Sequence, residues 1–95
     1  MKYSSYIDEI TQNKIYVVPG YQWNTLDRYT IRIFAEKKPE YQGSSRKILR
    51  YFPQIDDNKE ENIYEVGPRE GFRYLKDAKI ALEQTLKELG IVING

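Results

Sequence analysis

Two short apolar runs of this chain each carry an arginine at their centre. The first run is RYTIRIF, residues 28–34, with Arg32, and the second is ILRYF, residues 48–52, with Arg50. A guanidinium group binds carboxylates and phosphates through parallel hydrogen bonds in one plane. The chemistry indicated by this pattern is recognition of an anionic group.

Each of these arginines is followed two positions later by a phenylalanine, Phe34 and Phe52. Residues two apart lie on the same face of a strand, so each guanidinium is expected to share its face with an aromatic ring. Trp23, the only tryptophan, is a further candidate contact for a protein or a nucleic-acid base, with a buried position at the core edge as the alternative. Tyrosine, which is enriched at protein interfaces, occurs nine times.

Basic residues are concentrated around the two runs, although the whole chain has a net charge of only +1. From Arg28 to Arg50 seven basic residues stand against two acidic ones, a local charge of +5, whereas residues 56–65 carry a local charge of −4. The tip of the segment between the runs holds Lys37, Lys38, Arg46 and Lys47. A basic ribbon of this kind suits phosphate contacts, and the alternative is a solvated edge that lysines protect from aggregation.

Two residue types that often carry catalysis and metal binding are missing. The chain has neither cysteine nor histidine, which excludes thiolate chemistry, disulfides and histidine bases. The acidic stretch DDNKEEN, residues 56–62, lacks the spacing and central glycine of a calcium loop. The stretch GPREG, residues 67–71, lacks the lysine of a Walker loop. We therefore expect a solvated acidic loop, a GPREG turn, and a non-enzymatic protein without cofactor or metal.

The candidate arginines must be positioned by strands. Runs rich in β-branched and aromatic residues predict strands at residues 14–18, 28–36, 46–52 and 63–67. Pro19-Gly20, Pro53 and Gly67-Pro68 are expected to end the first, third and fourth of these strands. Consecutive strands with short connections favour an antiparallel sheet.

One long helix is predicted after the strands, from Tyr74 to Leu89, because leucine and alanine recur at helical spacing. Gly90 is expected to end this helix as its C′ residue, with Ile91 as the accompanying hydrophobic contact. Ser4 or Ser5 is a candidate cap for a further short helix in the first dozen residues. IVING, residues 91–95, is a candidate last strand or docked tail. The expected fold class is α+β: a small antiparallel sheet of three to four strands packed on one C-terminal amphipathic helix, in a single domain of residues 1–95.

A hairpin symmetric about Tyr41 would place Arg32 opposite Arg50. In that register one face carries Tyr29, Ile31, Ile33, Leu49 and Tyr51 and packs on the helix. The other face carries Thr30, Arg32, Phe34, Ile48, Arg50 and Phe52. Two facing arginines repel each other, and a carboxylate or phosphate bound between them would relieve this repulsion. In the alternative, the arginines pair with Glu65 or another acid of an adjacent strand, and the N-terminal segment or the IVING tail covers the phenylalanines.

Two functions fit these features. The first is a small protein-binding accessory, adaptor or inhibitor, of the phage accessory type, that uses the open sheet face and the basic hairpin. The second is a nucleic-acid-binding domain in which Arg32, Arg50 and the 37–47 hairpin contact phosphates of DNA or RNA.

The element order and the basic hairpin are similar to those of the small sheet-plus-helix DNA-binding domains of phage integrases and plant AP2 factors. That resemblance implies DNA contact through the sheet, although those domains are commonly more basic and lack the acidic segment found here. The chain shows no secretory signal and no long apolar segment, which predicts a cytoplasmic protein without membrane contact. The separated charges leave head-to-tail self-association open as a mode of assembly.

Overall fold

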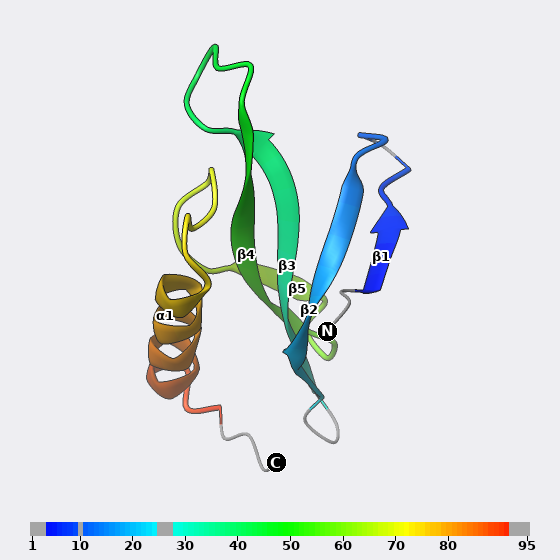
Figure 1. The fold of residues 1–95 in the computed structure, drawn as a ribbon. Coiled ribbons are helices and arrows are strands. Elements are labelled where there is room, and N and C mark those ends of the chain that lie inside the picture. Colours follow the sequence, from blue (N-terminus) through cyan, green and yellow to red (C-terminus); the bar gives the residue numbers. More distant parts are fainter. Residues whose placement is uncertain (1–3, 10, 25–27, 92–95) are drawn as a thin grey trace.

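The computed structural model describes residues 4–9, 11–24 and 28–91, but not the side chains of Ser4 and residues 19–24. The described residues form one antiparallel sheet and a C-terminal helix (Figure 1). The elements are β1 (Ser4–Ile7), β2 (Lys14–Asn24), β3 (Tyr29–Pro39), β4 (Lys47–Asp57), β5 (Asn62–Glu65) and α1 (Leu75–Glu88). The strands lie side by side in chain order, β1-β2-β3-β4-β5. The expected α+β class is confirmed, with five strands in place of three or four.

The core lies between α1 and one face of the central strands. The buried residues of α1 are Ala78, Leu82 and Leu86, and the two leucines join a cluster of inward side chains from β2, β3 and β4. The members of this cluster are Val18, Ile31, Ile33, Ala35, Ile55, Leu82 and Leu86. Full burial of an isoleucine side chain contributes about 2 kcal/mol, so this face of the sheet is the main source of hydrophobic stabilisation.

The C-terminus of α1 is formed as predicted. Gly90 has a φ of 70° and donates its amide hydrogen to the carbonyl oxygen of Lys87, and the Ile91 amide donates to the carbonyl oxygen of Leu86. These two bonds make a Schellman motif, which satisfies carbonyl groups that the helix end leaves unpaired. Ile91 packs against the core cluster. The N-cap, Tyr74, makes no side-chain hydrogen bond to the helix.

Residues 4–7 form a strand, so the prediction of a short N-terminal helix was wrong. Ser5 and Ile7 pair with Tyr16 and Lys14 across β1 and β2. A tight turn follows, in which the Asp8 amide donates to the Asn13 carbonyl oxygen. The backbone groups along the outer edge of β2 need hydrogen-bond partners, and β1 supplies them. Long-range pairing therefore outweighed the local helical spacing.

Pro19 and Pro53 were each expected to end a strand, but both lie inside one. β2 continues through Pro19-Gly20, with a register irregularity against β3 between Val17 and Gln22. β4 continues through Pro53, whose carbonyl oxygen accepts a hydrogen bond from the Val66 amide on the β5 side. Because the nitrogen and the oxygen of one strand residue point to the same neighbour, the missing N–H of Pro53 removes no bond to β3. Proline is tolerated at such a position.

The register of the β3–β4 hairpin differs from the expected one by four residues. Arg32 lies opposite Gln54, and Arg50 lies opposite Glu36. The two arginines therefore do not face each other, and the prediction of a repulsive Arg32–Arg50 pair was wrong. Because four is an even number, the shift leaves every side chain on its expected face. Ile31 and Ile33 are fully buried, and Arg32 and Phe34 are only half-buried on the opposite face.

Candidate interaction face of the sheet

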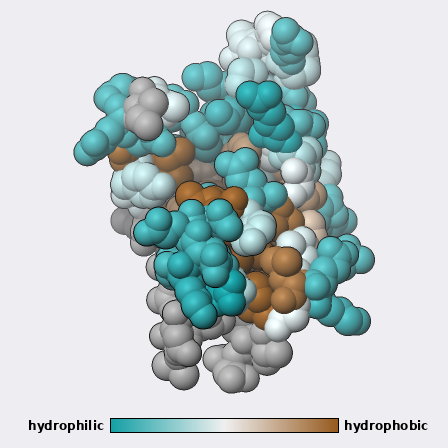
Figure 2. Space-filling view, turned by 180° about the vertical axis from the view of Figure 1, so that it is seen from behind, coloured by the Kyte–Doolittle hydropathy of each residue, from teal (hydrophilic) through white to brown (hydrophobic). Residues whose placement is uncertain are grey.

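The face of the sheet opposite α1 is hollowed into a depression of about 780 Å³. All five strands contribute hydrophobic side chains to it, namely Tyr6, Ile15, Val17, Phe34, Phe52 and Ile63. Its charged lining residues are Asp8, Arg32, Glu36, Asp56, Glu65 and Arg69. From behind the view of Figure 1, the molecule shows patches of hydrophobic surface among hydrophilic side chains (Figure 2). We call this concave surface the open face.

Both phenylalanines of the open face are partly covered by other segments. The ring of Tyr6 in β1 meets the ring of Phe34 edge to face, with 6.4 Å between the ring centroids. Gly71 lies over Phe52, where an added Cβ atom would be 2.7 Å from the ring. Tyr6 of the N-terminal segment therefore covers Phe34 in part, in the way that one alternative expects. The GPREG turn approaches Phe52, and both rings remain half-buried.

Arg32 is paired within the open face. Its Nη2 atom lies 2.7 Å from Oδ2 of Asp56, and the side-chain Nε2 atom of Gln54 donates to Oδ1 of Asp56 at 2.7 Å. The guanidinium also lies over the Phe34 ring, 5.0 Å from its centroid. An acid of the adjacent strand therefore neutralises Arg32, as one alternative predicts. The acid is Asp56 and not Glu65, the example given in that alternative.

A second arginine–aspartate pair lies at the same end of β3 and β4. Nε and Nη2 of Arg28 donate to the two carboxylate oxygens of Asp57, at 3.0 and 2.8 Å. The Asp57 side chain is only 2% exposed, and the amides of Lys59 and Glu60 also donate to it. The hydrogen bonds from Arg28 lower the pKa of Asp57 from 3.8 to about 2, against the opposing effect of burial. The same contact raises the pKa of Arg28, so this candidate binding residue already has a partner within the chain.

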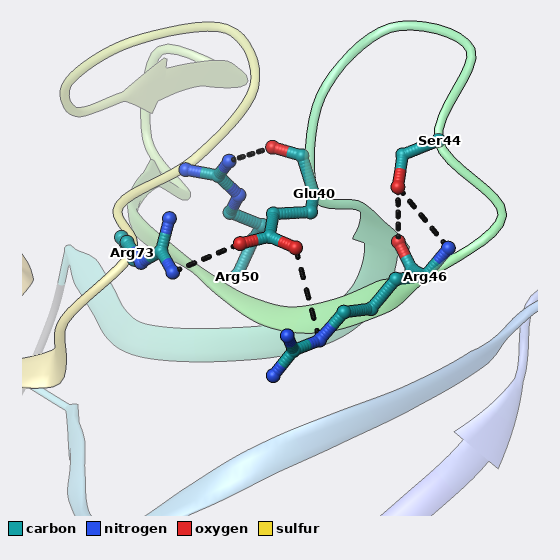
Figure 3. Close-up of polar contacts among 5 residues, drawn as sticks. All are labelled: Glu40, Ser44, Arg46, Arg50 and Arg73. Carbon is teal, nitrogen blue, oxygen red and sulfur yellow. Dashed lines mark hydrogen bonds and ion pairs between the residues drawn. The ribbon is translucent and has the colours of Figure 1, made fainter.

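At the other end of the hairpin, three arginines converge on Glu40 (Figure 3). Nη2 of Arg73 lies 3.1 Å and Nε of Arg46 lies 3.7 Å from the Glu40 carboxylate. Nη2 of Arg50 donates to the Glu40 backbone carbonyl oxygen at 2.9 Å, and the buried Nε atom of Arg50 has no hydrogen-bond partner among the described residues. Two guanidinium groups thus share the Glu40 carboxylate while a third binds the Glu40 backbone carbonyl, which leaves a local excess of positive charge.

The lysines of the hairpin differ in their surroundings. Lys38 lies 3.3 Å from the carboxylate of Glu36, which also accepts a hydrogen bond from the Asn13 side chain at 2.7 Å. Lys37 and Lys47 are exposed. The hairpin residues predicted to bind a partner therefore divide into Lys38 and Arg46, which have acidic neighbours, and Lys37 and Lys47, which extend into solvent.

Trp23, the remaining candidate binding residue, pairs through its backbone with Ile31. Its side chain lies outside the part of the chain that the structure describes, so neither the exposed nor the buried alternative is tested. Sequence reasoning missed Tyr6 and Glu40 as members of these clusters. Tyr6 is brought in by the pairing of β1 with β2, and Glu40 by its contact with the distant Arg73, so neither contact follows from local sequence.

The acidic stretch is not one solvated loop, in contrast to the prediction. Asp56 and Asp57 belong to β4, where they pair with Arg32 and Arg28, and only residues 58–61 form the connection to β5. Arg28 and Arg32 of the basic zone therefore lie beside Asp57 and Asp56 of the acidic zone, whereas the basic residues 37–47 lie at the other end of the hairpin. Among the described residues, no group of His, Cys, Asp or Glu side chains is arranged to hold a metal ion.

Comparisons of this chain with protein-family models, with curated proteins and with solved structures gave no match. Within the described residues, no helix has the length and hydropathy that crossing a bilayer requires.

Proposed function

We propose that this chain is a non-enzymatic protein-binding module whose contact surface is the open face. One observation carries the proposal: hydrophobic side chains from all five strands line a depression of about 780 Å³ that also holds charged groups. Large apolar patches with a polar rim are typical of sites where another protein docks. Phe34, Phe52 and Ile63 would be the apolar anchors, in keeping with an adaptor, inhibitor or accessory protein.

The distribution of charge favours a protein partner over a nucleic acid. Arg28 and Arg32 are each paired with an aspartate, so neither is left to neutralise a phosphate. The carboxylates of Glu36 and Glu65 also line the open face, and they would repel a phosphate backbone. A protein surface with mixed charges is complementary to such a pattern.

Capture from an extract of cells that express the protein would test this function. The baits are the wild-type chain, the open-face variant Ile63→Ser/Glu65→Lys and the control variant Ile80→Ser/Glu83→Lys. All four substituted residues are exposed, and the control places the same two changes on α1. Quantitative mass spectrometry should find proteins that wild type and control retain and that the open-face variant loses. Equal retention by all three baits would rule out the open face as the contact surface.

A nucleic-acid-binding domain is the second candidate, and the cluster around Glu40 favours it. Three guanidinium groups surround Glu40, two on its carboxylate and one on its backbone carbonyl. Together with the exposed Lys37 and Lys47, they give this end of the hairpin an excess of positive charge. Fluorescence anisotropy with single- and double-stranded DNA and RNA would test it. Binding should weaken steeply as salt is added, and the slope should fall in the variant Lys37→Gln/Lys47→Gln. Absence of binding at low salt would eliminate this candidate.

A further inference from the structure

The connection between β3 and β4 projects beyond the rest of the sheet, at the top of Figure 1. The β3–β4 pairing continues to Pro39 and Lys47. The turn itself is ordered by backbone hydrogen bonds, from the Glu40 amide to Arg46 and from the Ser44 amide to Tyr41. The tip, residues 37–47, is thus a protruding ribbon held in one conformation, which reduces the entropic cost of inserting it into a partner.

The tip combines an aromatic ring with positive charge. Tyr41 has 68% of its surface exposed, although tyrosine usually buries most of its ring. Four basic residues and one acidic residue lie between Lys37 and Lys47, a local charge of +3. An exposed aromatic ring surrounded by cations is the composition of an interface anchor.

The open face has the opposite character. Four carboxylates and two guanidinium groups line its depression, a charge of −2, around the hydrophobic side chains named above. Ile63 has 64% of its surface exposed there, and Glu65, two residues away on the same strand, is also exposed. A hydrophobic depression with net negative charge would accept a ring carried between basic residues.

These two complementary surfaces do not meet within one molecule. None of the described residues from Lys37 to Tyr51 lines the depression, whereas residues before and after this range on the same strands do. The tip points away along the direction of β3 and β4 (Figure 1). The complementarity can therefore be satisfied only between two molecules.

We propose, resting on the protein-binding function above, that the partner is a second copy of this chain, bound head to tail. The tip of one copy, with Tyr41 as the anchor, occupies the open face of the next copy. The two surfaces are different, so the contact is heterologous and each bound copy still offers a free tip and a free face. Assembly therefore continues beyond a dimer unless the rotation between copies closes a ring.

Sedimentation velocity over a concentration series would test this assembly. Wild type should sediment as species larger than the 11.3 kDa monomer as concentration rises, and added salt should weaken the association. The tip variant Tyr41→Ser/Lys47→Glu and the open-face variant Ile63→Ser/Glu65→Lys should each weaken association at least about tenfold, as expected for a lost aromatic anchor and a reversed charge. The controls Tyr74→Ser/Lys76→Glu and Ile80→Ser/Glu83→Lys make the same changes on and next to α1 and should associate as wild type does.

A mixture of the two defective variants gives the sharpest result. The intact tip of the open-face variant fits the intact face of the tip variant, so an equimolar mixture should form a dimer and nothing larger. A mixture that stays monomeric, or a wild-type chain that stays monomeric at every concentration, would overturn the inference. The inference would also be overturned if the tip variant dimerised as strongly as wild type, because the dimer would then use another surface. Loss of captured proteins by the open-face bait would still support the proposed function in each of these cases.

Discussion

The two faces of the sheet show how neighbouring residues of one strand acquire different roles. Ile31 and Ile33 lie under α1 and are fully buried, whereas Arg32 and Phe34, which alternate with them, lie half-buried on the open face. The aspartates at the end of β4 are divided in the same way. Asp57 is 2% exposed and accepts bonds from Arg28 and two amides, while Asp56 is 19% exposed and pairs with Arg32. The covered face therefore holds the buried groups of these strands, whereas the charges and rings of the open face stay partly in water.

The largest difference in the free energy of unfolding is expected between alanine substitutions of isoleucines on the two faces. Ile33→Ala should lower the free energy of unfolding by about 3 kcal/mol, because it leaves a cavity under α1. Ile63→Ala, at an exposed position of the open face, should lower it by less than about 0.5 kcal/mol. Urea unfolding followed by circular dichroism would measure both. Similar losses in the two variants would mean that the open face is part of the core.

Substitutions at two glycines with positive φ distinguish the cost of backbone strain from the cost of disturbed packing on the open face. Gly43 has a φ of 86° and no atom within 4 Å of an added Cβ, whereas at Gly71, with a φ of 84°, that Cβ would lie 2.7 Å from the Phe52 ring. Gly43→Ala should therefore cost about 1 kcal/mol from the backbone alone. Gly71→Ala should cost about 2 kcal/mol in the same urea titration, because Phe52 must also move. Equal costs would show that the GPREG turn does not pack on Phe52.

The two aspartates of β4 should respond differently to substitution and to pH. Asp57→Asn should lower Tm by roughly 5 °C at neutral pH, because buried donors lose a charged acceptor. The folded-state pKa of Asp57 is lowered from 3.8 to about 2. The stability from this shift is therefore complete above pH 3.8 and is lost as the pH falls towards 2. The Tm difference between wild type and Asp57→Asn should shrink over that interval. A constant difference in thermal scans across it would contradict the assigned pairing.

The smallest effect is expected for the ion pair of the open face. Arg32→Gln should change the free energy of unfolding by about 0.5 kcal/mol, because both partners remain partly in water and the pair is open to screening by salt. The same change should be smaller still at high salt. A loss comparable to that of Ile33→Ala in urea unfolding would show that the pair is structural, and the contrast between the two faces would then not hold at Arg32.

Several features of the fold could be predicted from local sequence alone. The helix over Leu75–Glu88, its end at Gly90 and the contact of Ile91 all depend on residues within a few positions of one another. The assignment of Ile31 and Ile33 to the core, and of Arg32 and Phe34 to the other face, depends only on the alternation of side chains along a strand. That assignment remained correct although the predicted register was four residues away from the observed one.

Only the tertiary structure decided the partners of each residue. The register depends on the turn at residues 40–46 and on the extension of β4 through Pro53, which is tolerated because its nitrogen faces away from β3. The pairs Arg28–Asp57 and Arg32–Asp56 join residues 29 and 24 positions apart, and β1 reaches the sheet only by pairing with β2. Sequence alternation thus determined which face each arginine occupies. Long-range strand pairing determined whether its charge was already neutralised, because a counter-ion is brought near only when distant segments pack together.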